Sequence, residues 1–209
     1  MKSGMIFSVD ATNGASRRLV VQIEVNGPFK GNIVEFRFPR WVPGSYFIRE
    51  PIQHMSDLSA TLDGKEIIAK RIDVDGVRVT GVSNASKLVI TYRLLAAEMT
   101  CRANHLDSTH VHIMPPYTWM LPTRGVEENR IDGQHIVKLI APKEWHTATQ
   151  LEGKEGSWVA NGRDEFLDAI MESNSNEMIT FEVMGTKQHL KLWDSGGLPI
   201  PEKGLNRLI

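Results

Sequence analysis

Residues 36–51 read FRFPRWVPGSYFIREP, a strand-like run that passes into a stretch with three prolines and a glycine. Proline fixes the backbone φ angle and a Pro-Gly pair sets a sharp bend, so we predict a strand followed by a rigid loop. In one interpretation the aromatic side chains of the loop simply pack on the domain. In the other, the loop presents Tyr46 and Arg49 at a surface or cleft, where a phenol and a guanidinium can recognise a carboxylate or a carbonyl.

Short β-rich runs surround this stretch, separated by Asn-Gly and Asp-Gly turn dipeptides. Each run carries β-branched or aromatic residues in near alternation. The predicted strands cover residues 17–25, 32–38, 66–73, 87–95, 135–141, 178–184 and 188–193. Strands of this length and spacing predict an all-β fold, an antiparallel β-sandwich with one short helix.

The run 87–95, KLVITYRLL, shows how these strands are expected to lie. Leu88, Ile90, Tyr92 and Leu94 fall on one face at a period of two, and the intervening residues fall on the other. We therefore predict that the face with these four side chains belongs to the core.

The one helical pattern lies at residues 163–172, where Phe166, Leu167, Ile170 and Met171 form an apolar face behind a possible Asn161 cap. The strand pattern ends at Trp193, and a glycine- and proline-rich joint follows. We predict a β-sandwich domain over residues 1–193, and a linker with the truncated start of a further domain over residues 194–209.

The balance of 24 basic and 25 acidic side chains gives a net charge of −1, which provides no electrostatic footprint for nucleic acid. No apolar run has the length of a membrane span, and residues 1–10 lack the apolar segment of a signal peptide. We therefore expect neither a nucleic-acid nor a membrane partner. The single Cys101 cannot form an internal disulfide, which favours a cytoplasmic location; a periplasmic one needs a signal peptide that has been removed.

Three of the seven histidines lie in the segment 101–112, CRANHLDSTHVH. His110 and His112 would share one face of a strand and could supply two ligands to a metal. The residues that follow supply no further ligand, so we expect no metal in this chain. Cys101 beside His105 could act as a nucleophile, but we expect it to be a packing residue. The HExxH pattern of many zinc peptidases is absent from the sequence.

Residues 38–50 resemble the P-x-W-x-P-G-S-Y-x-x-R signature in the N-terminal domain of glycyl aminopeptidases. Those proteins are zinc metallopeptidases in which this domain precedes a thermolysin-like catalytic domain and a PDZ domain. Three later segments agree in order: 102–110 with R-x-x-x-L-D, 142–149 with P-x-x-W-x-x-A-T, and 166–185, which closes with F-E-V-x-G. His105 departs from the family, where an aromatic residue such as Tyr is common.

The resemblance implies a noncatalytic N-terminal domain of a zinc metallo-aminopeptidase that acts on peptides with small N-terminal residues, Gly or Ala. It implies a β-sandwich related to the saddle-like first domain of other zinc aminopeptidases. It places the catalytic residues and the zinc in the next domain, so that this chain alone is not an enzyme and has no cofactor of its own. The expected partners are the protein's own catalytic and PDZ domains and a peptide substrate. The expected interface or cleft residues are Trp41, Tyr46, Arg49, Arg102 and Asp107.

Two other functions stay open on the sequence. One is a stand-alone β-sandwich that binds a carbohydrate or a protein on exposed Trp and Tyr side chains. The other is a cupin-like metal enzyme built on His110 and His112, which would need a glutamate shortly after the pair and a distant third histidine.

Overall fold

A computed structural model describes residues 4–42 and 47–194 of the chain. Its largest sheet has eight strands in the order β14-β15-β12-β1-β2-β8-β4-β5. Their bounds are Glu152–Lys154, Ser157–Asn161, Gln134–Ile140, Ile6–Asp10, Arg18–Asn26, Lys87–Leu95, Met55–Leu62 and Lys65–Ile67, respectively.

Two four-stranded sheets and one hairpin accompany the large sheet. The first small sheet has the order β11-β3-β7-β6, formed by Leu121–Arg124, Ile33–Arg37, Gly76–Thr80 and Ala69–Ile72. The second has the order β13-β16-β10-β9, formed by His146–Ala148, Met171–Asn174, His110–Ile113 and His105–Leu106. The hairpin consists of β17, Ile179–Val183, and β18, Thr186–Leu190.

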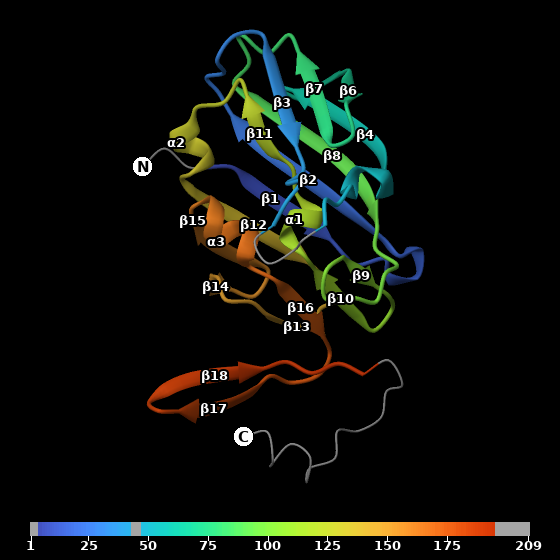
Figure 1. Cartoon of the computed structure of the whole chain (residues 1–209), viewed down its shortest axis with the longest axis vertical. Coiled ribbons are helices and arrows are strands. Elements are labelled where there is room, and N and C mark those ends of the chain that lie inside the picture. Colours follow the sequence, from blue (N-terminus) through green and yellow to red (C-terminus); the bar gives the residue numbers. More distant parts are fainter. Residues whose placement is uncertain (1–3, 43–46, 195–209) are drawn as a thin grey trace.

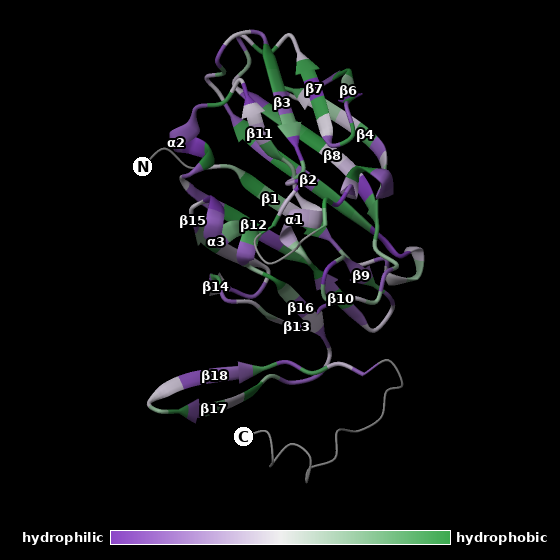
Figure 2. Cartoon of the chain, viewed as in Figure 1, coloured by the Kyte–Doolittle hydropathy of each residue, from purple (hydrophilic) through white to green (hydrophobic). Residues whose placement is uncertain are grey.

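The core lies where β3, β7 and β11 cover β2 and β8, one layer over the other (Figure 1). Strand β8 confirms the predicted alternation, because Leu88, Ile90, Tyr92 and Leu94 are all buried. On the facing layer Val34 and Phe36 of β3 and Val77 and Val79 of β7 belong to the same buried cluster. Burial alternates along β2 and β8, and hydrophobic residues predominate in the strands of both layers, as Figure 2 shows. Apolar burial between two layers is therefore what holds this fold.

The fold class confirms the sequence prediction of a mainly β protein with antiparallel sheets. A single pair in the described part of the chain, β1 with β12, runs parallel. All other strand pairs described are antiparallel.

The predicted helix at residues 163–172 is too long. Helix α3 covers Arg163–Asp168, its N-cap is Gly162, and no side chain caps it, so the Asn161 cap is wrong. Met171 and Glu172 instead belong to β16, where they pair with Ile113 and His112 of β10. Two further short helices, α1 at Pro115–Thr118 and α2 at Glu128–Ile131, were not predicted, nor were the 3-10 turns η1 at Gly14–Ser16 and η2 at Pro51–His54.

The predicted strand 66–73 is also wrong, because the chain divides there into two strands of different sheets. β5 pairs with β4 in the large sheet, and β6 pairs with β7 in the sheet above it. Ile68, at the crossing point, is 73% exposed. Cys101 is exposed as well, so its predicted packing role is also wrong.

No helix in the described ranges is long and apolar enough to span a membrane. The predicted linker and following segment, apart from Asp194, lie outside the described residues.

Candidate functional site

The loop that follows β3 is anchored to the core at its first residues. The backbone amide of Phe38 donates to the carbonyl of Asp75, at 2.9 Å. The Asp75 carboxylate, 3% exposed, accepts hydrogen bonds from the guanidinium groups of Arg37 and Arg40. Burial alone would raise the pKa of Asp75, but the two arginines outweigh it and lower that pKa. The base of the loop is thus a charged clamp on the turn between β6 and β7.

Beyond this clamp the loop turns large apolar side chains outward. Trp41, Phe47 and Ile48 are 60%, 68% and 73% exposed, so they do not pack on the domain. The interpretation in which the aromatic side chains of the loop pack on the domain is therefore wrong for Trp41 and Phe47. Exposed apolar groups clustered on one short segment are typical of an interaction surface.

Arg49 and Arg102, two of the predicted interface residues, come together beside this segment. Both line a depression of about 500 Å³ whose wall also includes Phe47, Ile48 and Tyr117. The guanidinium of Arg49 lies over the Tyr117 ring, 5.8 Å from its centroid, a cation–π arrangement. We call Trp41, Phe47, Ile48, Arg49 and Arg102 the loop surface.

The other two predicted interface residues are not part of the loop surface as described. Tyr46 lies outside the described residues. Asp107 accepts hydrogen bonds from the backbone amide and the hydroxyl of Thr109, at 2.7 and 2.8 Å. Burial would raise the pKa of Asp107, yet these bonds lower it on balance. Asp107 closes the tight turn between β9 and β10.

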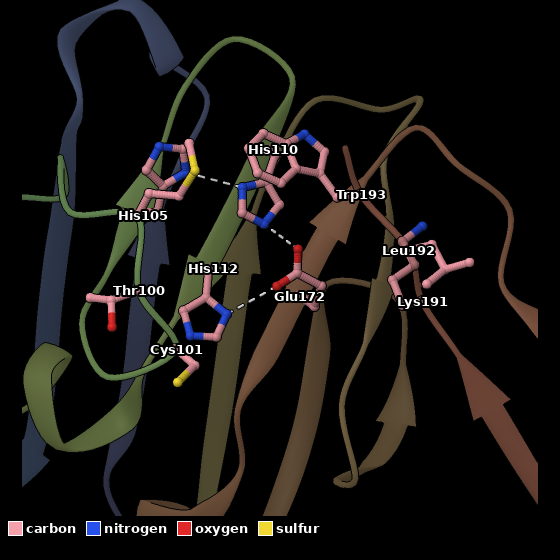
Figure 3. A pocket seen from close by; sticks show the side chains of 10 residues that line it. Thr100, Cys101, His105, His110, His112, Glu172, Lys191, Leu192 and Trp193 are labelled. Carbon is pink, nitrogen blue, oxygen red and sulfur yellow. Dashed lines mark hydrogen bonds and ion pairs between the residues drawn. The ribbon is translucent and has the colours of Figure 1, made fainter. Parts of the chain in front are cut away.

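A second cluster of polar side chains lies on β10 and its neighbours (Figure 3). The imidazole nitrogens His110 Nε2 and His112 Nδ1 face the two oxygens of the Glu172 carboxylate, the second at 3.0 Å. His105 Nδ1 lies 3.1 Å from His110 Nδ1, and a hydrogen bond there needs a proton on just one of the two nitrogens. We call His105, His110, His112 and Glu172 the histidine–glutamate cluster.

Burial and charge set the protonation states in this cluster. Burial would raise the pKa of Glu172, but its hydrogen bonds to His110 and His112 outweigh that effect and lower it. Burial, followed by the neighbouring His110, lowers the pKa of His105. Glu172 is therefore an anion held between two imidazoles, and His105 is neutral.

The chain closes over this cluster after the hairpin. The indole of Trp193 stacks on the His110 ring, with its Nε1 donating to Thr109 Oγ1 at 3.1 Å. An open depression of about 450 Å³ is left beside it, lined by the cluster together with Cys101, Lys191 and Trp193 (Figure 3).

The two histidines that the sequence offers as metal ligands both contact one carboxylate. His110 and His112 both lie on β10, as predicted, but both point at Glu172. The described ranges contain no group of three or more His, Cys, Asp or Glu side chains arranged to hold a metal ion. The cluster thus joins β10 to β16 through contacts between imidazole nitrogens and a carboxylate.

Sequence reasoning missed Glu172, because 60 residues separate it from His112. The sequence pattern predicts a helix at Glu172, and only its pairing in a strand brings it opposite the histidines. The alternation His-x-His was the one signal available, and it located two members of the cluster on one face.

Comparison with known proteins identifies the family of this chain. A model described as the Peptidase M61 N-terminal domain matches residues 7–171. The chain belongs to this family. It is a metallopeptidase family, and the M61 N-terminal domain covers both the loop surface and most of the histidine–glutamate cluster. Glu172 directly follows the last matched residue, and Trp193 lies after the hairpin, well beyond it.

Solved structures agree with this M61 assignment in fold. An aminopeptidase N family protein from Idiomarina loihiensis is 20% identical, with a TM-score of 0.78 over 88% of this chain and 32% of its own. Aminopeptidase A from Legionella pneumophila, in complex with aspartic acid, is 8% identical, with a TM-score of 0.51 over 86% of this chain and 22% of its own. The chain thus spans a third or less of either structure. Among curated proteins there is no significant match.

Proposed function

We propose that this chain is the noncatalytic N-terminal domain of a zinc metallo-aminopeptidase that removes small N-terminal residues, Gly or Ala, from peptides. Its task is to pack on the catalytic domain and to help wall the cleft that restricts substrates to a chain end. The observation that carries the packing role is the loop surface, with three large apolar side chains that are more than half exposed. Two of them, Phe47 and Ile48, line a depression together with Arg49 and Arg102.

The chemistry of the loop surface suits both parts of this role. Apolar side chains at the centre of an interface with arginine beside them are the usual composition of protein contact sites. A guanidinium near a cleft wall can also bind the carboxylate of a peptide. Zinc and its ligands are expected in the following catalytic domain, together with a PDZ domain.

A pair of isoleucines gives a matched test of the packing role. Ile48 on the loop surface and Ile68 between β5 and β6 are both 73% exposed. In the full-length protein, Ile48→Ser is expected to lower peptide turnover and the melting temperature of the domain pair, whereas Ile68→Ser leaves both unchanged. Equal effects of the two variants would contradict the role of the loop surface.

The role of Arg49 has its own measurement. In the full-length protein Arg49→Ala is expected to reduce turnover of Gly- and Ala-initiated peptides, and unchanged turnover and stability would remove Arg49 from the proposal. The 209-residue chain by itself is expected to hydrolyse no aminoacyl substrate and to bind no stoichiometric zinc. Metal-dependent cleavage by the purified chain would refute its noncatalytic role.

The exposed Trp41 favours one alternative, a stand-alone module that binds carbohydrate or protein. The gene beyond Ile209 discriminates between the two. An HExxH motif in the continuing reading frame supports the peptidase, and a stop codon there with glycan binding that Trp41→Ala abolishes supports the module.

A further inference from the structure

The hairpin β17–β18 stands apart from the sandwich at the end of the described chain (Figure 1). Its two strands pair with each other and with no other strand in the described ranges. An isolated two-stranded hairpin is at best marginally stable in water, so a hairpin of this kind needs a surface to pack on.

The register of the hairpin sorts its side chains into two unlike faces. Ile179 lies opposite Leu190, and Phe181 and Val183 share their face, which also carries Gln188 and Thr186 at its edge on β18. The other face carries Thr180, Glu182, Lys187 and His189, and the Thr180 hydroxyl is 3.0 Å from His189 Nδ1. The hairpin is therefore amphipathic, with one face suited to burial and the other to water.

The base of the hairpin is fixed to the sandwich, which sets the direction in which it projects. The side-chain amides of Asn174 and Asn176 both donate to the carbonyl of Leu192, at 3.3 and 2.9 Å. The Lys191 ammonium donates to the carbonyls of the same two asparagines. Hydrogen bonds thus join the segment that enters the hairpin to the segment that leaves it. The exposed Val183 and Met184 lie at the far end of the hairpin.

Two observations and one physical argument indicate what covers the apolar face. The M61 N-terminal domain match ends at residue 171, before the hairpin begins. The Idiomarina loihiensis structure is about three times as long as the part that this chain covers. Polypeptide that continues from the hairpin is held close to it, at a high effective concentration.

We propose that β17 and β18 are a structural part of the following catalytic domain, which packs on the face formed by Ile179, Phe181, Val183 and Leu190. The domain boundary then falls near residue 175 and not at residue 193. This inference rests on the proposed function, but it uses a different surface from the loop surface.

Adjacent residues on opposite faces provide the test, Phe181→Ser with Glu182→Ser as its control. In the 209-residue chain neither variant is expected to change the melting temperature. In the full-length protein Phe181→Ser lowers the melting temperature of the catalytic domain and Glu182→Ser does not. Amide hydrogens of residues 179–183 exchange at least about tenfold more slowly in the full-length protein than in the 209-residue chain.

Three results would overturn the inference. Equal exchange of residues 179–183 in both proteins would show that nothing covers the hairpin. A loss of stability on Phe181→Ser in the 209-residue chain would place the apolar face on the sandwich. A dimer of that chain that Phe181→Ser dissociates would make a second copy the occupant. Failure of the proposed function differs from all three, because the wild-type full-length protein would then cleave no peptide.

Discussion

The indole of Trp193 lies nearly parallel to the imidazole of His110, with ring centroids 4.1 Å apart and planes 16° apart. These residues are far apart in the chain, one after the hairpin and the other on β10. Their contact returns the end of the described chain to the centre of the second small sheet. It therefore joins the histidine–glutamate cluster to the segment from which the proposed catalytic domain continues.

Removal of the indole tests this link. Trp193→Ala is expected to cost about 1–2 kcal/mol in the free energy of unfolding, because it loses a stacked pair on a half-buried ring. Trp193→Phe keeps a ring for stacking and loses the bond to Thr109, so its loss should be smaller. Urea unfolding of both variants measures the difference. Equal losses would show that the stacking contributes nothing.

Glu172→Gln tests the charge that holds β16 to β10. The variant keeps the shape of the side chain but loses the anion between two imidazoles, at a cost of about 1.5–3 kcal/mol. Because the folded-state pKa of Glu172 is lowered, its stabilisation is complete above pH 4.5, the ordinary pKa, and is lost as pH falls through the folded pKa. The gap between wild type and variant should therefore close in acid.

Denaturant titrations of both proteins at a series of pH values measure that gap. Glu177→Gln, an exposed glutamate on the loop before the hairpin, is the control and should follow the wild type at every pH. A gap that stays constant from neutral pH into acid would contradict the assignment of Glu172 as a paired anion.

His135 makes the core sensitive to acid in a separate place. Its Nε2 donates to the carbonyl of Ile131 at 2.8 Å, and its Nδ1 accepts from the amide of Met5 at 3.3 Å, so it is neutral. Burial lowers its pKa below the ordinary 6.5. Above pH 6.5 His135 is neutral in both the folded and the unfolded protein, so it does not affect the pH dependence of stability there. As pH falls from 6.5 through the folded pKa, the unfolded protein takes up the proton more readily, and stability is lost.

His135→Gln is expected to destabilise the protein by about 1–3 kcal/mol at pH near 8 and to flatten the loss of stability below pH 6.5. His146→Gln, at an exposed position on β13, should do neither. The free energy of unfolding measured across this pH range decides between them. A His135→Gln protein with an acid slope as steep as the wild type would exclude His135 as a source of that slope.

The fold was predictable from the sequence where one strand contains its own evidence. Apolar residues recur at every second position from Leu88 to Leu94, and this period alone predicts which face of β8 is buried. Boundaries that depend on a partner strand were not predictable. Met171 continues the apolar helical pattern, but the pairing of Met171 and Glu172 with β10 overrides that pattern. Likewise, nothing local in residues 66–73 shows that the chain changes sheets at Ile68.

The candidate site was predictable to a similar extent. Proline and glycine marked the loop, and the exposed Trp41 and the convergence of Arg49 with Arg102 agree with an interface, which stays a prediction. Glu172 and Trp193 could not be found, because strand pairing and the return of the chain after the hairpin bring them to the histidines. Side chains that are brought together only by tertiary structure have no characteristic spacing in the sequence.

Asp75 is expected to hold the loop surface in place, and its neighbour Asp73 provides the comparison. Both carboxylates accept bonds from Arg37 and Arg40, but Asp75 is 3% exposed and Asp73 is 52% exposed. Asp75→Asn should cost about 1.5–3 kcal/mol, because it leaves two guanidinium groups without their buried anion. Asp73→Asn should cost much less than Asp75→Asn, since solvent screens an exposed pair.

The lowered pKa of Asp75 adds a pH signature to this difference. Its stabilisation is complete above the ordinary pKa of 3.8 and is lost as pH falls through the folded pKa. The two variants should therefore differ in stability at neutral pH and converge in strong acid. Because Phe38 is bonded to the backbone of Asp75, the amide hydrogens of residues 38–42 should also exchange faster in Asp75→Asn. If Asp73→Asn matched Asp75→Asn in both measurements, the buried position of Asp75 would not be what fixes the loop. The loop would then be held by Arg37 and Arg40 irrespective of which carboxylate they contact.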